Sequence, residues 1–159
     1  MKTILVSIFA ILSTSVFAQN PLESFESIIG GEWWLGEESY QTFEWGVGNL
    51  SVKGESYFVI NGEHVKVSDG EWFYHPGENK IRGFFNAQNM PINFFDYETS
   101  FDDKGNMINS IIGFGSMGNG LTFHETWEFT SENSFIWTLY TIGEGGSLTE
   151  MMKDTYYRK

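Results

Sequence analysis

The sequence contains no cysteine among its 159 residues. A chain without cysteine can form no disulfide, and it offers neither a thiol nucleophile nor a thiolate ligand for zinc. Thiol chemistry and cysteine-ligated metal sites are therefore excluded, and packing alone must stabilise the fold.

Basic residues are also few. Nine Lys and Arg stand against 21 Asp and Glu, which gives a formal net charge of −12 at pH 7. Charge of this sign repels nucleic acid and anionic lipid surfaces, so we expect no nucleic-acid partner. The acidic residues are spread along the chain rather than gathered in a tail, which favours a role in solubility over an acidic recognition patch.

No hydrophobic run is long enough to span a membrane. The apolar stretch at residues 4–12 ends after about ten residues, whereas a membrane-spanning helix needs about 20. With Lys2 before it and the small-residue site at residues 16–18 after it, this stretch is typical of a signal peptide. We therefore expect residues 1–18 to be removed. Residues 19–159 should form one domain, periplasmic or secreted, without membrane insertion.

Aromatic residues are abundant, at 18% Phe, Trp and Tyr, which indicates a large interior lined with rings. Apolar side chains within residues 21–29 recur at helical spacing and predict one or two helical turns that close one end of the fold. From Glu32 onward the period is two, and turn signals such as Asn61-Gly62 recur. The predicted strands are residues 32–35, 39–46, 50–60, 63–75, 80–88, 92–101, 107–117, 121–130, 134–142 and 148–158.

The connections between these segments are hairpins, too short for a helical crossover. An open sheet of about ten antiparallel strands would leave two exposed edges. The sequence therefore predicts an all-β fold, a single antiparallel up-and-down closed β-barrel of about ten strands with a short N-terminal helical leader. A sandwich is the alternative, but it usually needs a long Greek-key connection, and none is visible.

Motifs at both ends of the expected barrel bear on its family. Gly31-Glu32-Trp33 opens the first strand as Gly-x-Trp, and Tyr156-Tyr157-Arg158-Lys159 closes the last. This pairing resembles the calycin superfamily, the lipocalins and fatty-acid-binding proteins, in which a first-strand Trp packs under the barrel against a basic residue of the last strand. The resemblance implies that Trp33 and Arg158 are neighbours.

Further motifs lie between these ends. They are Asp102-Asp103-Lys104-Gly105, Glu125-x-Trp127-x-Phe129 and Phe135-x-Trp137-x-Leu139-Tyr140. Together with the Tyr-x-Arg-Lys ending they resemble a family of exported bacterial lipocalin-like proteins of unknown function, over most of residues 30–159. Where that family usually continues the last strand with an apolar residue, this chain has Asp154. The resemblance implies no catalytic residues.

Three histidines, His64, His75 and His124, are the candidates for metal or haem ligands. No two of them have the spacing of a metal site, so neither a metal site nor a cofactor is predicted. His124 is the reasonable counterpart of the haem ligand that some ten-stranded calycins carry. Strand parity, however, places Glu125 and Trp127 on the more apolar inner face and His124 outside.

The same parity points Glu125 into the barrel among aromatic side chains. A buried carboxylate requires a partner, and Arg158 is the leading candidate, with the Tyr156 hydroxyl or a Trp N–H as substitutes. Glu125 then either forms an internal ion pair that fixes the strand register or anchors a ligand in an apolar cavity. An acid–base enzyme using Glu125 and Asp154 ranks third, because two carboxylates alone define no reaction.

These features predict an exported lipocalin-like barrel that binds a small hydrophobic or aromatic molecule. The alternatives are a hydrolase or isomerase acting on a hydrophobic substrate in the same cavity, and a filled-core barrel with an acidic interaction surface. No Ser-His-Asp order, phosphate-binding loop or dinucleotide motif occurs, so no catalytic residue is predicted. The predicted ligand-binding residues are Trp72, Tyr74, Phe85, Glu125, Trp127, Trp137, Tyr156 and Arg158.

Overall fold

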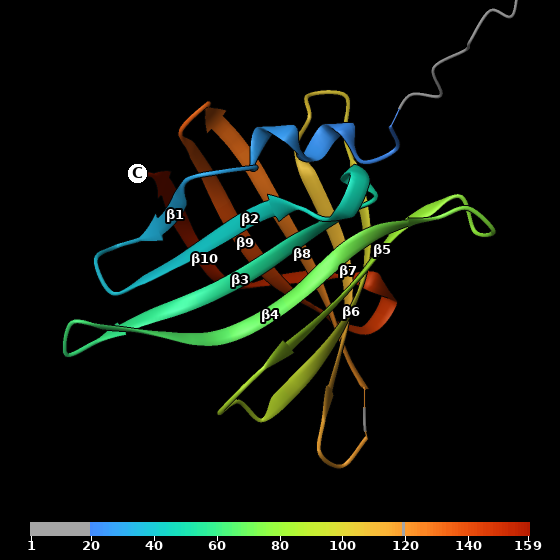
Figure 1. Ribbon diagram of the computed structural model, residues 1–159. Coiled ribbons are helices and arrows are strands. Elements are labelled where there is room, and N and C mark those ends of the chain that lie inside the picture. The colour runs from blue at the N-terminus through green and yellow to red at the C-terminus, as the bar shows by residue number, and fades with distance from the viewer. Residues whose placement is uncertain (1–19, 119) are drawn as a thin grey trace, which may run out of the picture.

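The computed structural model describes residues 20–118 and 120–159 (Figure 1). Ten antiparallel strands form one closed barrel, in which each strand pairs with its neighbours in sequence and β1 pairs with β10. The predicted up-and-down closed barrel is confirmed, and a sandwich is excluded. The signal peptide expected over residues 1–18 lies outside the described residues, as does residue 119, between the predicted strands 107–117 and 121–130.

The strands lie close to their predicted positions. They are β1 (Glu32–Leu35), β2 (Ser39–Trp45), β3 (Ser51–Ile60), β4 (Glu63–His75), β5 (Lys80–Ala87), β6 (Ile92–Phe101), β7 (Met107–Gly115), β8 (Gly120–Ser131), β9 (Ser134–Ile142) and β10 (Leu148–Arg158). Each predicted boundary falls within two residues of the observed one. Alternation and turn residues together specify where each hairpin reverses.

The leader forms the expected helical turn, a 3₁₀ helix η1 (Glu23–Ser27). Two further 3₁₀ turns, η2 (Val47–Asn49) and η3 (Glu144–Gly146), were not predicted from the sequence, which indicated helix in the leader. Both lie in hairpin connections and include a glycine with positive φ, Gly48 at 64° and Gly145 at 70°. No helix in the two described ranges is long and apolar enough to cross a membrane.

A close-packed core fills the end of the barrel that η1 covers. Its buried members are Leu22, Phe25, Ile28, Trp33, Phe43, Val52, Trp72, Met107, Trp127, Phe135 and Tyr156. The ring centroid of Phe25 lies 5.4 Å from that of Trp72 and 5.1 Å from that of Phe101. The indole N–H of Trp33 donates to the carbonyl of Ile28 at 2.9 Å. The leader therefore closes this end, as expected, and we call it the closed end (Figure 1).

Strands β1 and β10 close the barrel over a short stretch, in which Trp33 pairs with Arg158 and Trp34 with Tyr157, and Glu32 exchanges backbone hydrogen bonds with Lys159. The guanidinium carbon of Arg158 lies 4.3 Å from the centroid of the Trp33 ring, so the predicted contact is confirmed. Within the described chain, residues 148–156 of β10 have no strand partner on the β1 side, and residues 148–154 are all exposed. We call the half of the barrel beside this unpaired edge the open half.

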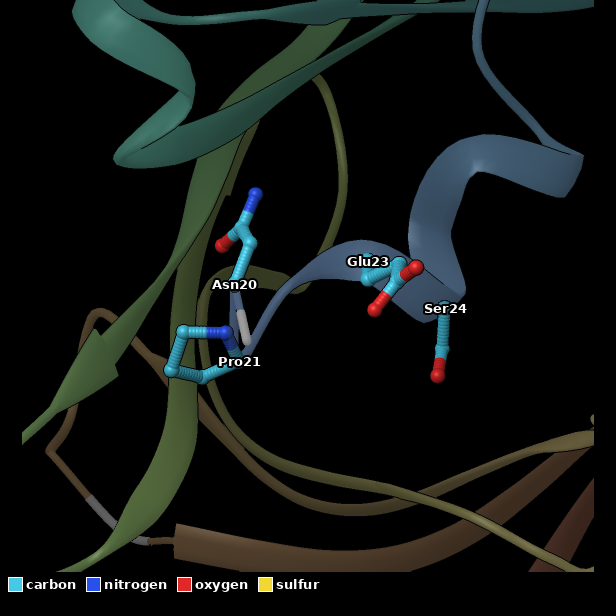
Figure 2. A pocket seen from close by; sticks show the side chains of 4 residues that line it. All are labelled: Asn20, Pro21, Glu23 and Ser24. Carbon is cyan, nitrogen blue, oxygen red and sulfur yellow. The ribbon is translucent and has the colours of Figure 1, made fainter. Parts of the chain in front are cut away.

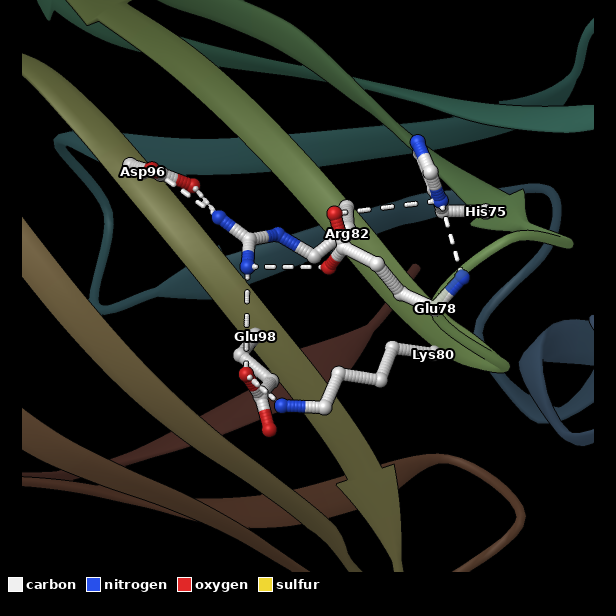
Figure 3. Close-up of polar contacts among 6 residues, drawn as sticks. All are labelled: His75, Glu78, Lys80, Arg82, Asp96 and Glu98. Atoms are coloured by element: carbon white, nitrogen blue, oxygen red, sulfur yellow. Dashed lines mark hydrogen bonds and ion pairs between the residues drawn. The ribbon is translucent and has the colours of Figure 1, made fainter.

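Ion pairs join β5 and β6 on the outer face of the barrel. The guanidinium of Arg82 donates to the carboxylate of Asp96 at 2.8 Å, and the ammonium of Lys80 to that of Glu98 at 2.7 Å (Figure 3). Exposed pairs of this kind contribute little stability, typically below about 1 kcal/mol each. Arg82 faces outward and is not available as a partner for Glu125.

Candidate functional site

Glu125 lies near the middle of β8 and points into the barrel, where it is 5% exposed. Its burial was predicted from strand parity and is confirmed. Towards the closed end the next inward residue is Trp127, which is 4% exposed. Towards the open half it is Phe123, which is half-buried. Glu125 therefore marks the boundary between the filled and the open parts of the interior.

Neutral donors satisfy the carboxyl group of Glu125. Nδ2 of Asn109 on β7 donates to Oε2 at 2.7 Å, and the indole N–H of Trp137 on β9 donates to Oε1. Oδ1 of Asn109 in turn accepts from the hydroxyl of Thr99 on β6 at 2.6 Å. We call these four residues, on four neighbouring strands, the polar belt. A Trp N–H was one of the predicted substitute partners, and this part of the prediction is confirmed.

The predicted ion pair between Glu125 and Arg158 is wrong. Arg158 lies at the closed end, where its guanidinium stacks on Trp33 and its Nη2 donates to the carbonyl of Ser27 at 2.5 Å. Both residues face inward but lie at different positions along the barrel axis. Glu125 pairs with Leu139 of β9, and Leu139 pairs with Met152 of β10 rather than with Arg158. Within the described part of the chain, Glu125 forms no ion pair at all.

Burial raises the pKa of the Glu125 carboxyl above its ordinary value. The N–H groups of Trp137, Trp127 and Asn109 oppose this rise, because they favour the charged form. Nε1 of Trp127 is buried, and its N–H group acts on the Glu125 carboxyl as a hydrogen-bond donor, in poorer geometry than the other two. A buried carboxyl without a counter-ion is the kind of group that binding and catalytic sites contain.

Two tyrosine hydroxyls belong to the same region. The pKa of Tyr97 is raised by burial and then by the charge of Glu125. The pKa of Tyr156 is raised by burial, then by Glu125 and then by Asp154. Both hydroxyls therefore stay protonated near neutral pH and remain able to donate.

Sequence reasoning missed three residues of this region, Tyr97, Thr99 and Asn109. Asn109 is fully buried on β7 between the inward residues Met107 and Ile111. A polar residue at an inward position of an otherwise apolar strand requires a buried partner, and this signal could have identified Asn109 as the neighbour of Glu125.

The eight predicted ligand-binding residues differ in burial. Trp72, Trp127 and Tyr156 belong to the closed-end core, and Tyr74, Phe85 and Trp137 pack against it. Tyr74 is half-buried and donates its hydroxyl to Asn79 Oδ1 at 2.7 Å, in the turn between β4 and β5. Phe85 and Trp137 are half-buried, Glu125 lies at the boundary of the open half, and Arg158 lies at the closed end. The role of all eight in ligand binding stays a prediction.

Beyond Glu125 the inner wall of the open half is apolar and accessible to solvent. The register places Leu139 of β9 beside Glu125, and Met152 of β10 beside Leu139. Leu139 is half-buried, and Met152 is 50% exposed. Asp154 pairs with Trp137 and is exposed. This wall offers apolar contact area with a carboxylate at its edge.

Phe85 on β5 covers the opposite wall. A Cβ atom added at Gly54 would lie 2.9 Å from the Phe85 ring, and one added at Gly70 would lie 2.6 Å from it. A Cβ atom added at Gly83 would lie 2.6 Å from the indole ring of Trp72. Only glycine leaves room for rings to lie this close to the strands. The two rings are 4.5 Å apart and continue the aromatic packing towards the open half.

Two surface depressions lie away from these residues. One, of about 390 Å³, is lined by Asn20, Pro21, Glu23 and Ser24 of the leader (Figure 2). The other, of about 410 Å³, is lined by Lys66, Val67, Ser68, Asp69, Asn86, Ala87 and Gln88 on β4, β5 and the turn after β5. Neither includes a predicted ligand-binding residue, so neither belongs to the candidate site.

The histidines lie apart from the polar belt. Nδ1 of His64 is 2.9 Å from the hydroxyl of Tyr40, and the ring of His124 packs against that of Tyr140 at 5.9 Å. No group of three or more His, Asp or Glu side chains that could hold a metal ion occurs among residues 20–118 and 120–159.

Comparison with known protein families finds no family model that matches this sequence, and comparison with curated proteins finds no match either. The closed ten-stranded antiparallel barrel is compatible with a lipocalin-like fold.

Proposed function

We propose that this chain is an exported lipocalin-like barrel that binds a small apolar or aromatic molecule in its open half. The observation that carries the proposal is the change in the inner wall at Glu125. On one side the rings are close-packed, and on the other side Leu139 and Met152 present apolar surface that solvent reaches. A concave apolar wall with a few buried polar groups is the usual form of a small-molecule site.

The unpaired edge of β10 supports this proposal, because it supplies an entrance. Residues 148–156 lack a strand partner on the β1 side, so no strand covers the approach to Met152 from that direction in the described chain. A ligand entering there would meet the apolar wall first and the polar belt last. Export is proposed from the signal-peptide pattern of residues 1–18.

The two alternatives gain less support. The closed end is filled, as the filled-core alternative expects, but a filled core leaves the exposed inner wall of the open half unexplained. The enzyme alternative needs a free acid or base, whereas both carboxyl oxygens of Glu125 already accept N–H donors.

Titration with the neutral dye N-phenyl-1-naphthylamine tests the proposal. We expect saturable binding to the wild type and, for Met152→Lys, about tenfold weaker binding, because a charge would then occupy the apolar wall. Leu148→Lys is the matched control, since Leu148 lies on the same strand with the same 50% exposure but on the outer face. Equal losses in both variants, or no binding by the wild type, would overturn the proposed site.

A native mass spectrum of the purified protein complements this titration. An added mass that is lost on denaturation would identify a co-purifying ligand. The mass of the chain itself reports whether residues 1–18 have been removed. A chain of full mass from an exporting host would contradict the signal-peptide interpretation.

A further inference from the structure

The free edge of β10 is a surface that the fold leaves without cover. Over residues 148–156 the strand pairs with β9 on one side, and in the described chain no strand pairs with its other side. The side chains of residues 148–154 are all exposed. The backbone N–H and C=O groups of such an edge can pair with a further strand, so an exposed edge is a place where another chain can dock.

A β-bulge gives this edge an unusual arrangement of charge. The register against β9 shifts at Met151, which is the extra residue. Glu150 pairs with Tyr140 and Lys153 with Thr138, and alternation places both of these β9 residues on the outer face. In a regular strand, residues three apart lie on opposite faces. Because of the bulge, Glu150 and Lys153 lie on the same face, the outer one.

These two charges are unused within the chain and complement a second copy of it. Both side chains are exposed, and neither takes part in an ion pair among the residues that the structure describes. When an antiparallel copy sets its Lys153 opposite Glu150, two-fold symmetry also sets its Glu150 opposite Lys153. On the inner face the same register sets Thr149 opposite Asp154, whose carboxylate can accept from the threonine hydroxyl.

Other registers between two copies of this edge are disfavoured. An alignment of Lys153 with its own copy, or of Glu150 with its own copy, brings like charges together, which is destabilising. A shift by one residue from the complementary register places outward side chains opposite inward ones. A lysine and a bulge on an edge normally discourage pairing, whereas here the bulge aligns the lysine with a glutamate of the second copy.

We propose that the free edge of β10 is the contact of a symmetric dimer, in which two copies pair β10 with β10 antiparallel through Glu150 and Lys153. This inference does not rest on the proposed function. The paired edge is short, so we expect a dissociation constant of about 10–100 µM. The second copy covers the approach to Met152, so a ligand enters the monomer, and dye titrations at about 1 µM protein measure that state.

Charge reversal tests this register on the purified protein. Sedimentation velocity from about 1 to about 300 µM should show the wild type passing from monomer to dimer. Glu150→Lys alone sets lysine against lysine, and Lys153→Glu alone sets glutamate against glutamate, so each variant should dimerise at least about tenfold more weakly. An equimolar mixture of the two variants restores both opposite-charge pairs and should dimerise as tightly as the wild type.

Glu128→Lys is the matched control, because it makes the same change of charge on the exposed outer face of β8, two strands away from the edge. It should dimerise as the wild type does. Dimerisation that both single variants retain would overturn the proposed register, as would a mixture that stays monomeric while the wild type dimerises. A wild type that remains monomeric at about 300 µM would overturn the dimer and leave the ligand proposal standing.

Discussion

The two halves of the barrel share strands and alternation but differ in packing. At the closed end, Phe135 of β9 is fully buried, and its ring stacks on those of Trp127 and Tyr156 with interplanar angles of 3° and 12°. Four residues further along the same strand, Leu139 also faces inward but is only half-buried. Alternation decides which face of a strand is inward, whereas the cover over that end of the barrel decides whether the inward face is buried.

Two local features produce this difference. The leader inserts Phe25 against Trp72, and this contact seals one end. At the other end β1 stops at Leu35, so β10 continues without a partner over residues 148–156. The closed end stabilises the fold through its packed core, whereas the open half retains apolar surface that a ligand can cover.

The largest expected effect is on the free energy of unfolding and comes from comparing Phe135→Ala with Leu139→Ala. Phe135→Ala removes a fully buried ring from a stacked cluster and should lower the free energy of unfolding by about 3–5 kcal/mol. Leu139→Ala removes a half-buried side chain and should lower it by about 1 kcal/mol. Urea unfolding followed by tryptophan fluorescence measures both. Similar losses would mean that the open half is packed as tightly as the closed half.

The sequence predicted the barrel well because the signals that specify it, alternation and turn residues, lie within short segments of the chain. Period-two alternation and glycine-rich turns gave the ten strands and placed Glu125 inside. The Gly-x-Trp resemblance gave the contact of Trp33 with Arg158.

The identity of the residues that contact Glu125 depends on their positions along the barrel axis. Alternation gives the inward face of each strand but not these positions. Two inward residues can belong to opposite ends, as Glu125 and Arg158 do. Height follows from the stagger of the strands, which accumulates around the barrel. The exposure of Asp154 depends on the short pairing of β1 with β10, and strand lengths predicted from sequence do not show which residues pair.

A smaller effect is expected at the closed end for Arg158→Met. The variant keeps the length of the side chain but loses the contact of the guanidinium with Trp33 and its hydrogen bond to the carbonyl of Ser27. We expect a loss of about 1–2 kcal/mol in the free energy of unfolding, because this site is only partly buried.

Lys153→Met on the same strand is the control for Arg158→Met, since Lys153 is exposed and its change should stay within about 0.5 kcal/mol. Hydrogen exchange should also show faster opening of the leader in Arg158→Met. Unchanged exchange there would show that Phe25 and its neighbours hold the leader without the arginine.

The smallest effect concerns the pH dependence of stability at Glu125, on the boundary between the halves. Burial raises the pKa of its carboxyl in the folded protein above the ordinary value of 4.5. At pH values between 4.5 and the raised pKa of the folded protein, the folded state binds more protons than the unfolded state. The stabilisation due to the proton is fully present below pH 4.5 and is lost as the pH rises through the folded pKa. The slope is at most about 1.4 kcal/mol per pH unit.

Glu125→Gln cannot titrate, so the free energy of unfolding of the wild type minus that of the variant should fall as the pH rises from about 4 to about 8. Urea unfolding at each pH measures this difference. Glu128→Gln is the control, because it removes the same charge from the exposed outer face of the same strand. A difference for Glu125→Gln that stays flat or rises with pH would show that solvent reaches the carboxyl freely. The boundary between the two halves would then lie closer to the closed end, at Trp127.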